Sequence, residues 1–164
     1  MFKQRSNKHL LFLLFNIAFI SFMLDQMTKR WALEALELHT PLPVTSFFNF
    51  FLTYNKGVSF SLFYNTTSYG PFLLAGMGLL ICFFVLYWMI KETDTKTKIG
   101  LSLVLGGAIG NIVDRIRFGY VVDFLDFYFN TYHWPAFNLA DSFICLGAFF
   151  IFIQIFFKKE EEQK

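Results

Sequence analysis

Hydrophobic residues along the chain fall into four long runs separated by shorter polar segments. The first run, from Leu10 to Leu24, becomes long enough to cross ~30 Å of hydrocarbon if its helix continues to about Trp31. Three further runs lie between residue 71 and the charged tail. The pattern predicts four transmembrane helices, with spans at about residues 10–31, 71–90, 99–113 and 138–157.

The composition supports the membrane class and narrows the range of partners. Of 164 residues, 55% are hydrophobic and 25 are Phe, well outside the profile of a soluble domain. The net charge of +2 is small and its basic residues are dispersed, which argues against nucleic acid as a partner. We therefore expect residues 1–164 to form a single integral-membrane domain.

A segment between the first two spans has strand character. At about residues 44–64, Val58, Phe60 and Leu62 alternate with serines, after a turn at Asn55-Lys56-Gly57. The pattern predicts a small β-sheet at the membrane surface, outside the bundle. Such a sheet either contacts a substrate or serves only as a packing platform, and both readings stay open.

Lys and Arg residues predict the orientation of the spans. Three precede the first span, three lie in residues 91–98, and three follow the fourth span, against five in the other connections. Under the positive-inside rule both termini are then cytoplasmic. The two remaining segments, about residues 30–69 and 114–137, would face outward.

Acidic residues gather between Gly106 and Asp141, beside two membrane spans. A charge at the centre of a membrane costs about 2.5 to 3.5 kcal/mol on insertion scales, so ionisable residues near membrane helices indicate a functional site. Gly106 and Gly110 form a small-xxx-small pair that favours helix packing over direct substrate contact. The charged residues of the segment are Asp114, Arg115, Arg117, Asp123, Asp126 and Asp141.

Five blocks in a fixed order make the chain resemble signal peptidase II, the bacterial lipoprotein signal peptidase. The resemblance covers nearly the whole length. It implies a membrane aspartic peptidase domain that removes the signal peptide from diacylglyceryl-modified prolipoproteins, cleaving before the lipidated cysteine. The blocks are Asp25-Gln26-Met27-Thr28-Lys29, Asn55-Lys56-Gly57, Gly106-Gly107 through Gly110-Asn111 to Asp114-Arg115, Val121-Val122-Asp123-Phe124 and Phe137-Asn138-Leu139-Ala140-Asp141.

The resemblance also implies a set of site residues. Asp123 and Asp141 would be the catalytic pair, with no cofactor and no metal. The expected setting is the bacterial cytoplasmic (inner) membrane, with the active site toward the outer face and a monomer as the working form. The supporting or substrate-binding residues carried over are Asp25, Asn55, Gly57, Asn111, Asp114, Arg115 and Asn138.

A carboxyl pair suits peptide hydrolysis because one ionised group activates water while one protonated group polarises the carbonyl. Structural alternatives exist for both residues. Asn138 can cap a helix whose positive end favours Asp141, and Asp123 can lie in an interfacial loop that meets water. Asn111, Asp114 and Arg115 can orient the pair or only satisfy a polar helix end, and both can hold.

Two other functions and a metal-dependent chemistry are alternatives to a peptidase with a carboxyl pair. A transporter would place its ionisable groups near mid-span and often show repeated halves, which this sequence lacks. A structural assembly protein would leave the acidic cluster unexplained. A metal site of His133, Asp126 and Asp114 lacks a repeated short ligand spacing, as do Cys82 and Cys145, which we expect to be buried apolar residues.

Overall fold

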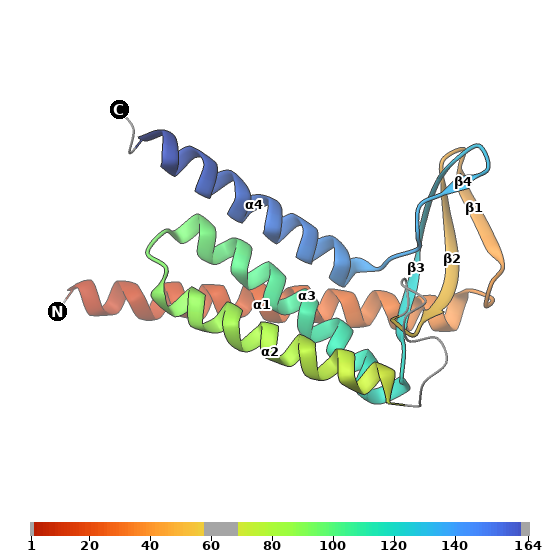
Figure 1. Cartoon of the computed structure of the whole chain (residues 1–164), viewed down its shortest axis with the longest axis horizontal. Helices are drawn as coiled ribbons and strands as arrows, with labels where there is room; N and C mark the ends of the chain where they lie inside the picture. The colour runs from red at the N-terminus through yellow and green to blue at the C-terminus, as the bar shows by residue number, and fades with distance from the viewer. Residues whose placement is uncertain (1, 58–68, 162–164) are drawn as a thin grey trace.

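The computed structural model describes residues 2–57 and 69–161 and shows a helical bundle with a small sheet at one end (Figure 1). The strands form one antiparallel sheet in the order β1-β2-β3-β4. The predicted fold class, four membrane helices with a small sheet, is confirmed. The elements are α1 (Phe2–Ala35), β1 (Pro41–Thr45), β2 (Phe48–Asn55), α2 (Gly70–Lys91), α3 (Thr95–Phe118), β3 (Val121–Phe129), β4 (Tyr132–His133) and α4 (Leu139–Glu161).

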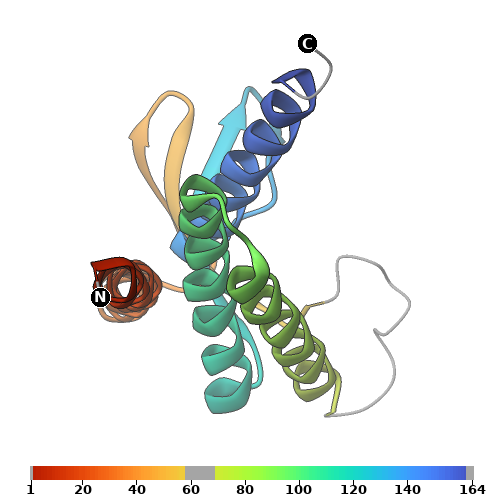
Figure 2. The ribbon, with the colours of Figure 1, turned by 90° about the vertical axis from the view of Figure 1, so that its left-hand side faces the viewer.

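Helix α3 lies at the centre of the bundle and packs against α1, α2 and α4 (Figure 2). Within the described residues it is also the most buried of the four membrane-length helices. Its composition explains this position, since glycines let other helices approach closely while polar residues near its end need protein partners. The other three helices turn much of their surface outward.

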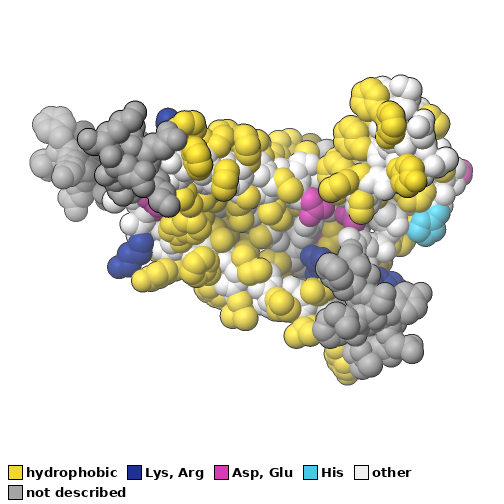
Figure 3. Space-filling model, turned by 45° about the horizontal axis from the view of Figure 1, so that its top comes forward, with side chains coloured by type: hydrophobic (Ala, Val, Ile, Leu, Met, Phe, Trp, Pro, Cys, Tyr) yellow, Lys and Arg dark blue, Asp and Glu magenta, His cyan; other side chains and the backbone are white. Residues whose placement is uncertain are grey.

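That outward surface is apolar. Phe12, Phe19, Leu80 and Phe152 are each more than half exposed, and hydrophobic side chains cover most of the bundle in Figure 3. A monomeric soluble protein rarely exposes so large an apolar surface. All four helices are long and apolar enough to cross a membrane, so the bundle is that of a multi-pass membrane protein.

The third helix is longer than the sequence pattern predicted. Only residues 92–94 connect α2 to α3, because Asp94 caps α3 by accepting a hydrogen bond from the Thr97 N–H at 2.6 Å. The helix continues to Phe118 and ends at Gly119, whose φ of +74° lies in the left-handed region. Helix α3 thus begins before and ends after the span expected at about residues 99–113.

The sheet combines a predicted and an unpredicted half. β1 and β2 fall in and just before the predicted β-rich segment, while the alternation at residues 58–62 lies outside the described residues. β3 was read from the sequence only as part of an outer segment or as an interfacial loop. It is a strand of nine residues that pairs with both β2 and β4.

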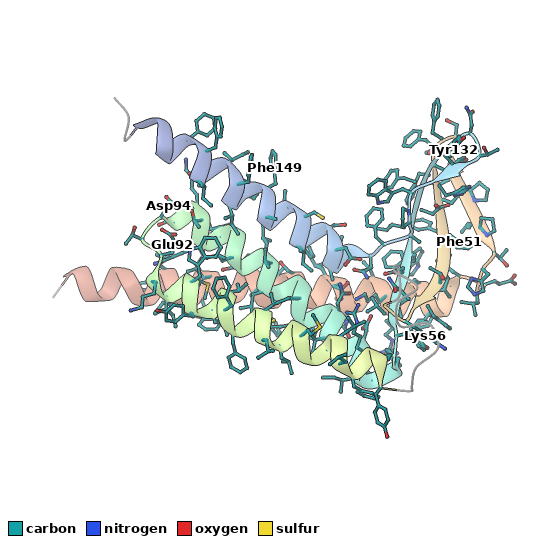
Figure 4. The ribbon with its side chains drawn as sticks, in the orientation of Figure 1. Phe51, Lys56, Glu92, Asp94, Tyr132 and Phe149 are labelled. Carbon is teal, nitrogen blue, oxygen red and sulfur yellow. The ribbon has the colours of Figure 1, made fainter. Side chains whose placement is uncertain are left out.

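The two ends of the bundle differ in character. Figure 4 places Glu92 and Asp94 at the α2–α3 turn, at the same end as both termini, and Lys56 at the opposite end beside the sheet. The chain crosses the bundle four times, so it ends on the side where it began, as the sequence predicts.

The expectation for the cysteines is half right, because Cys82 is buried and Cys145 is exposed on α4.

Glycines on α3 mark where neighbouring helices make their closest approach. A Cβ at Gly106 would collide with the backbone oxygen of Ala18 on α1, and one at Gly107 with the backbone oxygen of Ala140 on α4. A Cβ at Gly110 would collide with the Asp25 carboxylate. These contacts support the helix-packing reading of the glycines.

We predict that Gly107→Ala destabilises the protein, because backbone atoms of two helices cannot yield as a side chain can. Overpacking of this kind costs about 1–3 kcal/mol. The measurement is the thermal unfolding midpoint in detergent. Gly76→Ala, where a Cβ would meet nothing within 4 Å, is the matched control and should leave the midpoint unchanged or slightly raised. Equal midpoints for the two variants would contradict the packing argument.

Candidate active site

Asp123 lies on β3 where the sheet meets the bundle and is 1% exposed. Thr53 of β2 is its cross-strand partner, so Asn55, two residues further along, projects on the same face. The Asn55 side-chain amide donates to Asp123 Oδ2 at 2.9 Å. Asn55 Oδ1 in turn accepts the backbone N–H of Gly57 at 2.7 Å, which forms the turn that the sequence predicted.

Backbone hydrogen bonds bring Asn138 beside Asp123. The Phe137 oxygen accepts N–H groups from Phe124 and Leu125 at 3.0 and 2.9 Å, and the Phe137 N–H donates to Leu125 at 3.0 Å. This bridge holds the segment that leads into α4 against β3. Asn138, fully buried, then donates its side-chain amide to Asp123 Oδ1 at 2.7 Å.

Asp141 sits in the first turn of α4 and is partly exposed. Its N–H donates to Asn138 Oδ1 at 3.0 Å, and its Oδ2 accepts the Asn138 backbone N–H at 3.2 Å. This reciprocal arrangement is a capping box, so the capping alternative for Asn138 and Asp141 is part of the structure. Asn138 thus contacts both predicted catalytic carboxyl groups.

The surroundings of Asp123 favour its protonated form. Burial raises the pKa of the Asp123 carboxyl to about 6, the Asn55 amide opposes this shift, and the charge of Asp141 adds to it. The carboxyl therefore holds its proton below about pH 6 and loses it as pH rises further. The structural alternative, in which Asp123 lies in an interfacial loop that meets water, is wrong, because α1 and α3 cover the strand.

A buried ionic network lies next to the two carboxyl groups. Lys29 Nζ is 2.9 Å from Asp25 Oδ2, 3.0 Å from Asp114 Oδ2 and 2.9 Å from Asn111 Oδ1. Asn111 links this network to Asp141, because its Nδ2 donates to Asp141 Oδ1 at 2.8 Å. Five of the predicted supporting side chains are thus joined to the pair, three directly and two through Lys29: Asn55, Asn111, Asn138, Asp25 and Asp114.

Asp25 and Asp114 also bind backbone groups at the edge of the site. Asp25 Oδ1 accepts the N–H of Ala140 in the first turn of α4 at 2.9 Å. Asp114 Oδ2 accepts the N–H of Val122 on β3 at 3.2 Å. Each carboxylate therefore fixes the element that carries one of the two candidate catalytic residues.

Arg115 brings a second cation to the site. Its Nη1 donates to the Asn111 backbone oxygen at 3.2 Å, and the side chain lies within electrostatic reach of Asp141 and Asp123. Among the described residues its buried Nε has no hydrogen-bond partner. Gly57 is close by, since a Cβ there would lie 3.9 Å from Arg115 Nη2. The structure thus brings all nine residues named from the sequence into one region.

Sequence reasoning missed Lys29 and Gln26, although both stand in the first quoted block. Gln26 donates to Asp114 Oδ1 at 3.0 Å. The signal for Lys29 was its i,i+4 spacing from Asp25 within an apolar helix, where an unpaired charge would be costly. Reading the block for its pairs would have found both residues.

The residues of the rejected metal site belong to separate networks. Asp126 is buried on β3 and accepts the Asn49 side-chain amide at 3.0 Å, and His133 Nδ1 lies 2.9 Å from its Oδ2. Asp114 is instead paired with Lys29. Within residues 2–57 and 69–161, no three His, Cys, Asp or Glu side chains are arranged to hold a metal ion.

The protein has membrane-length helices and two carboxyl groups that both contact Asn138. These features define an integral-membrane protein whose candidate site contains two acidic side chains. The family model described as signal peptidase (SPase) II matches residues 17–157. The chain belongs to the signal peptidase II family, a family of membrane peptidases. The resemblance based on the five blocks is confirmed.

Curated relatives and solved structures agree with this assignment. The lipoprotein signal peptidase of Pseudoalteromonas atlantica is 38% identical over 88% of this chain and 89% of its own length. That of Teredinibacter turnerae is 43% identical over 82% and 81%. A bacterial membrane enzyme solved by the in meso method at 2.3 Å resolution matches with a TM-score of 0.78 and 27% identity, over 93% of this chain and 92% of that one.

Replacement of Asn138 separates capping from its contact with Asp123. Asn138→Asp retains a capping acceptor but places a carboxylate against Asp123, whereas Asn138→Ala loses both contacts. We predict that both variants lose at least about tenfold in peptidase turnover, within the range for residues that orient a reacting group. Asn138→Ala should in addition lose the roughly 1 kcal/mol of a missing cap, which thermal unfolding would measure. Full activity in Asn138→Asp would limit Asn138 to capping.

Proposed function

We propose that the protein is an aspartic endopeptidase that removes signal peptides from diacylglyceryl-modified prolipoproteins, cleaving before the lipidated cysteine. The observation that carries this proposal is the joint contact of Asn138 with Asp123 and Asp141. Curated relatives named lipoprotein signal peptidase support the substrate class. The whole chain, residues 1–164, would act as one domain.

The two carboxyl groups have different environments and hence different roles. Asp123 is almost fully buried and its pKa is raised, so it is the proton donor that polarises the scissile carbonyl. Asp141 is partly exposed at the N-terminus of α4, where N–H groups and the helix dipole favour a negative charge. It is therefore the ionised base that takes a proton from the attacking water.

The reaction follows from these roles. Water loses a proton to Asp141 as its oxygen bonds to the peptide carbonyl carbon, while Asp123 gives its proton to the carbonyl oxygen. The resulting tetrahedral diol collapses when Asp141 gives its proton to the leaving amine, the C–N bond breaks, and a diol hydroxyl returns a proton to Asp123. The pair ends with one proton, as it began, and needs no cofactor for this cycle.

Arg115, Asn111 and Asn55 support this chemistry from the surrounding elements. Asn55 and Asn111 fix the carboxyl groups through amide donors of 2.9 and 2.8 Å. Arg115 places a guanidinium group beside the pair, and the N–H donors of this group suit ligands that carry several oxygen atoms. We assign it to the polar part of the lipidated substrate. Gly57 lies next to that guanidinium group, and its positive φ and the nearby Leu74 side chain leave no room for a Cβ there.

Placement of the carboxyl groups favours a peptidase over a transporter. Asp123 lies on a strand at the sheet end of the bundle, and Asp141 is in the first turn of α4. Groups at the end of the bundle can reach both water and a peptide that leaves the membrane, whereas a relay would run through mid-span. The protein would act as a monomer in the bacterial cytoplasmic membrane, without nucleic acid.

We predict that Asp123→Asn and Asp141→Asn each reduce turnover by at least the ~10² to 10⁴ expected of a general acid or base. Asp126→Asn is the matched control, because Asp126 is equally buried on the same strand but pairs with Asn49 and His133. It should retain turnover within a few-fold. The assay is cleavage of a lipidated prolipoprotein in detergent. A loss below about tenfold at either position would remove that residue from the pair.

Cleavage should depend on the lipid of the substrate. Burial of an acyl chain contributes about 0.8 kcal/mol per CH₂, which brings the peptide to the membrane surface. Purified protein given matched prolipoproteins with and without the diacylglyceryl group should cleave only the modified form. Activity should survive a strong chelator, since a carboxyl pair activates water without a Lewis acid. Equal cleavage of both forms, or activity that zinc restores after chelation, would contradict the proposal.

Reporter fusions test the proposed orientation, in which both termini are cytoplasmic and the sheet faces outward. Fusions at the N-terminus, in residues 92–94 and after Lys159 should report cytoplasm, because basic residues flank these positions. A fusion at Thr131, in the hairpin between β3 and β4, should report the opposite side. A cytoplasmic signal at Thr131 would place the carboxyl pair on the wrong side for exported prolipoproteins.

A further inference from the structure

Lys29 is a buried lysine within the site, and no step of the proposed reaction uses it. Its side chain is 3% exposed, and its ammonium nitrogen lies 2.9 Å from Asp25 and 3.0 Å from Asp114. A third contact of 2.9 Å reaches the Asn111 Oδ1. A lysine has three N–H donors, so these contacts account for all of them. Two of these contacts are ion pairs with carboxylates, and the third is a hydrogen bond to the neutral amide of Asn111.

The third contact determines which way the Asn111 amide faces. A carboxamide has an oxygen end that accepts and a nitrogen end that donates, and an ammonium group can bind only the oxygen. The Asn138 side-chain amide donates to the same oxygen at 3.2 Å. The nitrogen end of Asn111 is thereby directed to Asp141 Oδ1, at 2.8 Å. With the amide reversed, Lys29 would face two N–H groups and Asp141 would lose a donor.

We propose that Lys29 is a positioning residue that keeps Asp141 the ionised member of the catalytic pair, by holding the Asn111 amide with its donor toward Asp141. This inference rests on the proposed function. A donor on Asp141 lowers the energy of the charged carboxylate. The charged groups that face this site are Asp25 and Lys29 from α1, Asp114 and Arg115 from α3, Asp123 from β3 and Asp141 from α4.

The test needs a variant that removes the ammonium group and leaves as little unpaired charge as the network allows. Lys29→Met alone would strand Asp25 and Asp114, whereas Lys29→Met combined with Asp25→Asn keeps the net charge of the network and leaves only Asp114, which still accepts the Gln26 amide and the Val122 N–H. Asp25→Asn alone is the reference, since its oxygen can still accept the Ala140 N–H. Arg30→Met is the matched control on the same helix, because the Arg30 side chain is 81% exposed and, among the described residues, its ion pair is with Glu34 on the helix surface.

Relative to Asp25→Asn, the double variant should lose about 10- to 100-fold in kcat, the range for residues that orient a reacting group, with little change in KM. The acidic limb of its kcat profile against pH should move to higher pH, because the ionised member of the pair has lost its donor. A structural role alone would lower the unfolding midpoint without moving this limb. Arg30→Met should change none of these values.

Asn111→Leu gives a second test that leaves both ion pairs of Lys29 intact. It should shift the acidic limb in the same direction, and adding the Lys29 and Asp25 changes should then cost little more, because Lys29 acts through Asn111. An unchanged limb in folded Asn111→Leu overturns the proposal, whether or not the double variant folds. Full additivity of the losses also overturns it. Retained activity in Asp141→Asn would instead refute the catalytic pair itself, so the two failures are distinct.

Discussion

The buried ion network of Asp25, Lys29 and Asp114 is the interaction on which the candidate site depends. Removing an unpaired charge from water is costly, so these groups are stable only when each meets an opposite charge and hydrogen-bond donors or acceptors. Here the cation on α1 is shared by carboxylates of α1 and α3. The carboxylates also accept N–H groups at the starts of α4 and β3. One network therefore fixes the relative positions of four elements.

Sheet and bundle contribute different halves of the carboxyl pair. The sheet supplies Asp123 on a rigid strand, and the bundle supplies Asp141 in the first turn of a helix. The backbone bridge between Leu125 and Phe137 closes the intervening chain, so that Asn138 reaches Asp123 while capping α4. Because a single asparagine serves both carboxyl groups, their separation is set by short hydrogen bonds rather than by loop length.

Close helix packing makes room for this polar site inside an apolar bundle. Gly107 lets α4 approach α3, and Gly110 leaves space for the Asp25 carboxylate against the same helix. A side chain at either position would separate the elements that carry the network. Small residues in α3 thus have a structural role that also shapes the site, while the exposed apolar side chains of α1, α2 and α4 suit contact with lipid.

Hydropathy alone determined the four spans, because transfer into a membrane is a sum over local residues, and the ordered blocks determined the family. Tertiary structure decided that β3 is a strand, that α3 continues through Asp114, and that Lys29 joins the site. Each outcome depends on partners distant in sequence: β2 supplies the ladder for Val121–Phe129, Lys29 stabilises the buried Asp114, and Phe137 brings Asn138 to Asp123. Strand pairing and buried charge are stabilised by such partners, and these contacts leave little signal in a local pattern.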